Sequence, residues 1–214
     1  MIIFYYYITV IFDILITYNH YHFMAFHEVF RSISCAFITL FALYNVITIN
    51  DHNYDLKYKN FRIEMLIRIM LMYTMIDLIY MKTTQNKRIE LRFHHYFVIV
   101  ISLISLLTGM LCIHLNIAYI AEAVSIFNFS RYVYQFDETV DLFHSIYKIT
   151  ILLLVRYPLW YFLFGLDYGI FTVVKLFIVI MCILDTYWIY GNFMKILSIL
   201  YKNDKKKSIN KIYS

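Results

Sequence analysis

Two adjacent histidines, His94 and His95, open a long apolar run that reads FHHYFVIVISLISLL. An imidazole can act as a general base toward an amine or a hydroxyl group, or as a nucleophile that accepts an acyl group. Asp77 lies near the end of the preceding apolar segment, and a carboxylate beside a histidine fixes its tautomer and stabilises its imidazolium form. We therefore predict that His94, His95 and Asp77 form a catalytic group.

Helix geometry limits how the two histidines can be used. Neighbouring residues on an α-helix point about 100° apart, because 3.6 residues make one turn, so His94 and His95 do not face the same point. We expect one of them to face an internal cavity, while the other orients its neighbour or meets the lipid headgroups. The alternative is that both are ordinary polar residues at the edge of a membrane-spanning helix.

Among the other ionisable residues inside predicted membrane spans, three are candidates for a binding site: Glu122, Arg156 and Asp185. A charged side chain at the middle of a span costs about 2.5–3.5 kcal/mol on insertion scales, so each needs a partner or a function. Glu122 is expected to share one cavity with Asp77 and the histidines, and Arg156 and Asp185 are expected to pair near mid-depth. We predict that Glu122, Arg156 and Asp185 line a substrate-binding site.

Five further histidines and the three cysteines predict no metal site, cofactor or disulfide. They are His20, His22 and His27 in a predicted loop, His114 and His144 at predicted interfacial span ends, and Cys35, Cys112 and Cys182 singly within apolar segments. The loop histidines have no suitably spaced carboxylate, and isolated cysteines in apolar runs are typical of buried free thiols. The GxSxG, HExxH and glycine-rich phosphate-binding motifs are also absent from the sequence.

Helices that cross a membrane must position the candidate residues. Of the 214 residues, 62% are hydrophobic and 15% are charged, whereas a soluble domain carries about 25% charged residues. A spanning helix needs about 20 mostly apolar residues. The sequence therefore predicts an all-α, polytopic membrane protein with about seven transmembrane helices, at 2–18, 29–49, 63–81, 93–108, 110–131, 143–164 and 169–200. Six is the alternative, because 93–131 holds either two short spans that meet near Gly109 or one span followed by an interfacial helix.

Positive charge gathers beside the apolar segments. The formal net charge is +5, and lysine and arginine cluster in residues 82–92 and in the tail 202–214. This pattern is typical of cytosolic segments of membrane proteins and not of nucleic-acid binding. Seven spans place both clusters on one side of the membrane, which favours seven and predicts a cytosolic C-terminus. Residues 2–12 lack the features of a cleaved signal peptide, so we expect a retained first helix.

The order of these motifs resembles the TLC domain, a family that includes ceramide synthases, translocating-chain-associated membrane proteins and small TLC-domain proteins. The chain is most similar to the small members. The similarity covers about residues 29–201, between a first helix with its loop (1–28) and a basic tail (202–214). It rests on RSISCAFITLFALYN in the second span, on TMIDLIYM, FHH and IAEAVSIFNFSRY in that order, and on LLLVRYPLWY in the penultimate span.

The resemblance implies a helical barrel around a lipid-sized cavity in the membrane of the endoplasmic reticulum. In ceramide synthases the histidine pair lies at the reaction centre, where an acyl group passes from acyl-CoA to the amine of a sphingoid base. Two functions are therefore expected here. One is lipid homeostasis through binding of a membrane lipid or an acyl chain without catalysis. The other is acyl transfer from acyl-CoA, as co-substrate, to a sphingoid base or another lipid acceptor through His94 or His95.

Overall fold

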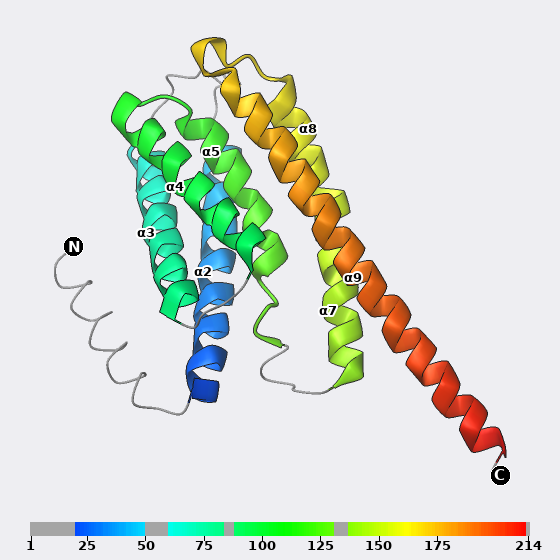
Figure 1. Cartoon of the computed structure of the whole chain (residues 1–214). Coiled ribbons are helices and arrows are strands. Elements are labelled where there is room, and N and C mark those ends of the chain that lie inside the picture. Colours follow the sequence, from blue (N-terminus) through cyan, green and yellow to red (C-terminus); the bar gives the residue numbers. More distant parts are fainter. Residues whose placement is uncertain (1–19, 50–59, 84–87, 131–136, 213–214) are drawn as a thin grey trace.

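The computed structural model describes residues 20–49, 60–83, 88–130 and 137–212, and the regular elements in these ranges are all helices (Figure 1). This confirms the predicted all-α class. Four helical segments are long and apolar enough to cross a membrane: Phe26–Thr48, Ile89–Thr108, Glu138–Gly165 and Val173–Lys202. The described part of the chain therefore has the features of a helical membrane protein.

The predicted number of seven spans exceeds these four. The predicted span 2–18 lies outside the described residues. The segment 63–81 forms α3 (Phe61–Thr83), which Arg62, Glu64, Arg68, Asp77 and Lys82 make too polar to count as a typical span. The segment 110–131 forms the short helix α5 (Cys112–Tyr119) and the 3₁₀ helix η1 (Ile120–Ser125). At 1.5–2.0 Å rise per residue the two together measure roughly 25 Å, less than the hydrocarbon core of about 30 Å.

Helix α5 can be short because protein surrounds it. It packs between α2 (His20–Thr48), α3 and α8 (Tyr157–Gly165), and α4 (Ile89–Thr108) lies beside α3 (Figure 1). Seven of the eight residues of α5 are buried, as is typical of a helix that is apolar all round. Within 93–131 the chain therefore forms two separate helices that meet near Gly109, the second of which is enclosed by protein.

The turn between α4 and α5 contains two residues in the left-handed conformation. Gly109 has φ 66° and Leu111 has φ 65°, and the amide of Gly109 donates a hydrogen bond to the carbonyl of Ser105 at 2.8 Å. Glycine adopts this conformation readily, whereas a residue with a Cβ pays about 1–2 kcal/mol. The almost completely buried side chain of Leu111 holds this conformation in place. The predicted helix boundary near Gly109 is confirmed.

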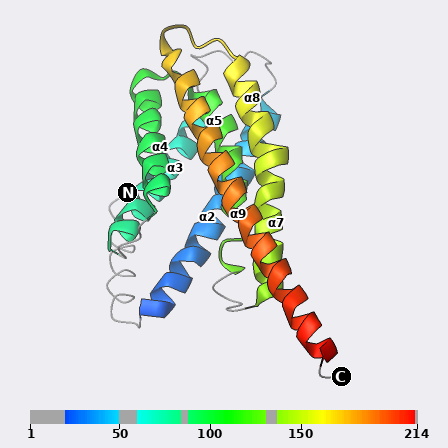
Figure 2. The same ribbon diagram turned by 45° about the vertical axis from the view of Figure 1, so that its right-hand side comes forward.

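The other side of the molecule consists of one interrupted helix and one continuous helix. α7 (Glu138–Ile151), the π-helical turn η2 (Leu152–Arg156) and α8 follow one another, and α9 (Val173–Ile212) returns after the 3₁₀ turn η3 (Gly169–Phe171). Figure 2 shows α9 crossing α7 and α8 at a slant. Pro158 accounts for the wide turn because it lacks an N–H and its ring clashes with the carbonyl four residues earlier. The turn ends at the buried Arg156.

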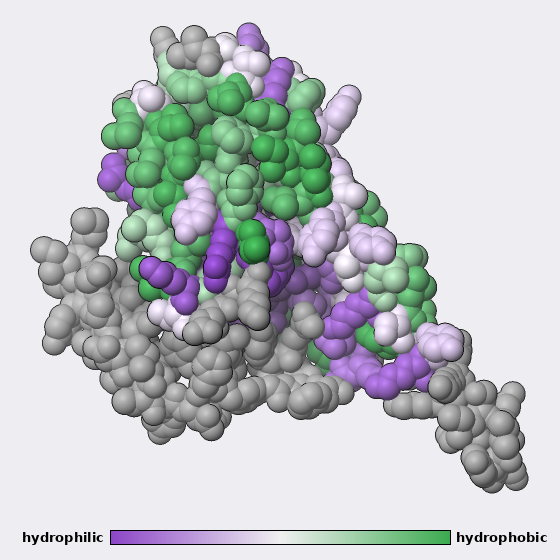
Figure 3. All heavy atoms as spheres, in the orientation of Figure 1, coloured by the Kyte–Doolittle hydropathy of each residue, from purple (hydrophilic) through white to green (hydrophobic). Residues whose placement is uncertain are grey.

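The outer surface separates into apolar and polar regions. Figure 3 shows apolar side chains over most of the upper part of this face and polar side chains gathered in its lower half. The C-terminal end of α3 and the start of α4 lie toward the same end of the molecule as the C-terminal end of α9 (Figure 1).

Candidate functional site

Asp77 is the centre of a buried polar cluster formed by α2, α3 and α4. Its Oδ2 accepts a hydrogen bond from Nη2 of Arg31 at 2.8 Å and also contacts Nε2 of His95. Its Oδ1 lies 2.8 Å from Nε2 of His27. The carboxylate is fully buried, and a buried carboxylate is tolerated only when it is paired and hydrogen-bonded. Two of these partners hydrogen-bond Oδ2, the third lies close to Oδ1, and they tie the three helices together.

His94 belongs to a second cluster. Its Nε2 lies 3.5 Å from Oε1 of Glu122, and its Nδ1 has no hydrogen-bond partner among the described residues. The ring of Tyr73 lies edge-on to that of His95, with centroids 6.5 Å apart. Cys35 joins the two clusters, because its Sγ lies 3.3 Å from the hydroxyl of Tyr73 and 3.7 Å from Oε2 of Glu122. Both His94 and His95 are buried. The alternative in which both are interfacial residues is therefore wrong.

Arg156 and Asp185 form the predicted pair. Nη1 of Arg156 lies 3.0 Å from Oδ1 of Asp185, and both side chains are buried. The indole N–H of Trp160 donates a hydrogen bond to Oδ2 of Asp185 at 2.7 Å. The guanidinium also lies over the rings of Trp160 and Trp188, at 5.6 and 5.4 Å from their centroids. Such cation–π contacts stabilise a buried arginine.

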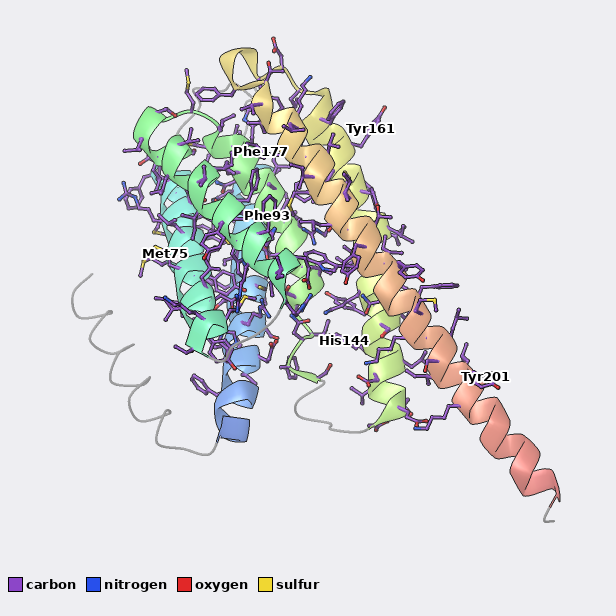
Figure 4. The ribbon with its side chains drawn as sticks, viewed as in Figure 1. Met75, Phe93, His144, Tyr161, Phe177 and Tyr201 are labelled. Atoms are coloured by element: carbon purple, nitrogen blue, oxygen red, sulfur yellow. The ribbon has the colours of Figure 1, made fainter. Side chains whose placement is uncertain are left out.

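An apolar cavity lies between α4, α5, α8 and α9. It holds about 710 Å³ of empty space, counted with its opening, and it is lined mainly by aliphatic and aromatic side chains. Figure 4 shows Phe177 extending from α9 toward α4, where its ring centroid lies 3.9 Å from that of Phe97. His94, Glu122 and Arg156 are polar residues of this lining. The cavity, called the apolar cavity below, thus combines a hydrocarbon-like wall with a small polar group.

The predicted catalytic group is divided between two places. His95 contacts Asp77, as predicted for one of the two histidines, but neither residue lines the apolar cavity. His94 lines the cavity, and its neighbouring carboxylate is Glu122. The adjacent histidines point apart, as the 100° rotation per residue requires. The structure therefore joins His94 with Glu122 and Arg156, while their catalytic and substrate-binding roles stay predictions.

The predicted loop that contains His20, His22 and His27 is wrong, because α2 begins at His20. His27 and Arg31 lie four residues apart on one face of this helix, and both contact Asp77. The spacing of four residues is the sequence signal that could have placed His27 and Arg31 together, because residues four apart on a helix are neighbours. The interfacial placement of His114 and His144 is also wrong. Both are buried, and His114 lines the apolar cavity.

The three cysteines and the possible metal ligands lie as follows in the described part of the chain. All three cysteines are free, with Cys35 and Cys112 buried and Cys182 partly buried. Within the described ranges, no three histidine, cysteine, aspartate or glutamate residues are placed to hold a metal ion. Around Asp77 the guanidinium of Arg31 already supplies the positive charge that a cation would bring.

The fold and the buried polar groups define an all-helical protein whose helices are suited to a membrane. Comparisons of the chain with protein families, with curated proteins and with solved structures found no match. The similarity to the TLC domain therefore stays a prediction that rests on the order of the sequence motifs.

Proposed function

We propose that this protein binds a membrane lipid or an acyl chain in the apolar cavity and acts in lipid homeostasis. The observation that carries this proposal is an open cavity whose mainly apolar lining includes His94, Glu122 and Arg156. Lipid-binding cavities need a hydrocarbon wall and a few polar groups that fix the orientation of the ligand.

The motif order supports a finer form of the same proposal. It is a TLC-type helical barrel of about seven spans in the endoplasmic reticulum, with a cytosolic C-terminus. The placement of the α3–α4 junction and the end of α9 on one side is compatible with that topology. Glycosylation sites introduced into the 50–59 segment and into the tail, followed in microsomes, test it. Modification of the tail would contradict the proposed orientation.

A cavity-filling substitution tests lipid binding. Ala118 lines the apolar cavity, so Ala118→Phe places a ring where the lipid is proposed to lie. We expect the variant to co-purify with about tenfold less lipid per protein, a loss of about 1.4 kcal/mol in binding. Bound lipid is measured by native mass spectrometry after purification in detergent.

The matched control is Leu107→Phe, because Leu107 on α4 is 85% exposed and faces away from the cavity. This variant is expected to retain the lipid content of the wild-type protein. Equal lipid content in Ala118→Phe, Leu107→Phe and the wild type would show that the apolar cavity is not the lipid-binding site.

Acyl transfer is a second candidate, and one observation favours it: His94 lies beside Glu122 and carries an unpartnered Nδ1 at the cavity. In this function His94 takes the proton of an amine or hydroxyl acceptor while the acceptor atom bonds to the thioester carbon of acyl-CoA. The carbon–sulfur bond then breaks, and the thiolate of coenzyme A leaves and takes up a proton. Glu122 stabilises the imidazolium formed on the way.

For this second function we expect His94→Ala to lower the rate of acyl transfer about 10²–10⁴-fold, as is usual when a general base is removed. The assay supplies acyl-CoA with a sphingoid base or a lysolipid and follows the product by mass spectrometry. Tyr96→Ala, two residues away and exposed, is the control and is expected to keep the wild-type rate. A wild-type protein that binds lipid and forms no product rejects acyl transfer and retains lipid binding.

A further inference from the structure

A second pocket, called the basic pocket below, lies between α2, α4, η1, α7 and α9 and holds about 450 Å³. Three cationic residues line it, Arg31, Arg88 and Lys148, and no acidic residue does. Ser125, Asn128 and Asn192 add hydroxyl and amide groups to the wall. Arg31 pairs with Asp77 and Arg88 pairs with Glu90, but neither acid lines the pocket. The lining is therefore richer in donors for anionic oxygens than that of the apolar cavity, which is mainly hydrocarbon.

The two pockets follow one another along the same helices. On α4, Leu91 lines the basic pocket and His94 lines the apolar cavity. From α7 to α8, Leu152 lines the basic pocket, and Arg156, about one turn further on, lines the cavity. The pockets are therefore neighbours, with the His94–Glu122 group near their junction.

Trp188 lies at this junction. Its ring lines the basic pocket, and it also contacts two residues of the apolar cavity. Its centroid is 6.3 Å from that of His94, and the guanidinium of Arg156 lies 5.4 Å from it. Its indole Nε1 is buried and has no hydrogen-bond partner among the described residues. An indole N–H in this position is a donor that a polar ligand group at the junction can use.

We propose that the basic pocket binds the phosphate headgroup of a single-chain lipid whose acyl chain lies in the apolar cavity. This inference rests on the proposed lipid binding and adds the chemistry of the headgroup. Arginine and lysine are the usual partners of phosphate oxygens, and arginine binds them with two parallel hydrogen bonds. A lipid in this position places the bonds that link head and tail beside His94 and Trp188.

Three probes test the proposal on the full-length protein in detergent. Lysophosphatidic acid carries both the chain and the phosphate, monoacylglycerol of the same chain lacks the phosphate, and glycerol 3-phosphate lacks the chain. We expect lysophosphatidic acid to bind about 10- to 100-fold more tightly than monoacylglycerol, because charge-assisted hydrogen bonds to phosphate are lost in the latter. Glycerol 3-phosphate alone is expected to show no measurable binding. Affinities are measured by native mass spectrometry.

Variants then locate the headgroup. Lys148→Gln combined with Arg88→Gln is expected to reduce the affinity for lysophosphatidic acid to that for monoacylglycerol, while the affinity for monoacylglycerol stays the same. Lys175→Gln is the control, because Lys175 contacts Phe164 and does not line the basic pocket. Arg31 is left unchanged because it holds Asp77.

Each outcome separates the two proposals. Equal affinity of the wild-type protein for lysophosphatidic acid and monoacylglycerol overturns the phosphate site and leaves lipid binding in place. Binding of glycerol 3-phosphate as tight as that of lysophosphatidic acid overturns a lipid headgroup in favour of a free phosphate compound. Binding of none of the three probes, together with no co-purifying lipid, removes the proposed function itself.

Discussion

Asp77→Asn is expected to lower the free energy of unfolding by about 3–5 kcal/mol, the usual cost of removing one member of a buried ion pair. The substitution preserves the size of the side chain but removes the charge that Arg31, His27 and His95 approach. The guanidinium of Arg31 would then be buried with only Glu28, 3.4 Å away, as an acidic partner. The effect is measured as a shift of thermal unfolding in detergent micelles.

Glu64→Gln supplies the control on the same helix. Glu64 is an acidic residue of α3 whose side chain is 30% exposed, and its contact with Arg68 is long, at 3.9 Å. Exposed pairs of this kind contribute about 0–1 kcal/mol. We expect Glu64→Gln to unfold close to the wild-type temperature, and equal unfolding temperatures for Asp77→Asn and Glu64→Gln would show that the Asp77 cluster does not stabilise the fold.

The sequence predicts the helical class and most helix positions, because long apolar runs leave few other structures. The sequence predicts more membrane-spanning helices than the described residues contain, and the cause is physical. Composition alone does not distinguish a helix that faces lipid from one that faces protein. α5 is apolar all round because it is enclosed, and α3 carries Asp77 because α2 and α4 shield it.

The sequence identifies many ionisable residues of the candidate site but not all of their partners. Asp77, Glu122 and Arg156 stand out because they are charged residues within apolar segments. A charged side chain inside a membrane span costs free energy unless it has a partner or a function. Which histidine meets which carboxylate depends on the rotation of α4 about its axis, and that rotation is set by packing. His27 was missed because three histidines and Glu28 interrupt the apolar residues at the start of α2, so that this part of the helix resembles a loop in composition.

Arg156 and Asp185 permit a test of whether a buried ion pair serves stability or ligand binding. Arg156→Met alone leaves the carboxylate of Asp185 buried without its cation, and Asp185→Asn alone leaves the guanidinium without its anion. Each single variant is expected to cost about 3–5 kcal/mol of unfolding free energy. The double variant removes both charges and retains an oxygen that accepts the hydrogen bond of Trp160.

We therefore expect the double variant to unfold within about 1 kcal/mol of the wild type, because an apolar or neutral replacement of a buried pair is often neutral or stabilising. Thermal unfolding and bound lipid are measured on the same four proteins. A stable double variant that has lost its lipid would show that Arg156 serves the ligand, since the cavity wall is otherwise unchanged. If the loss of unfolding free energy in the double variant equals the sum of the losses in the two single variants, the pairing is contradicted. Two residues that stabilise the fold only through their mutual contact should give a smaller loss in the double variant than that sum.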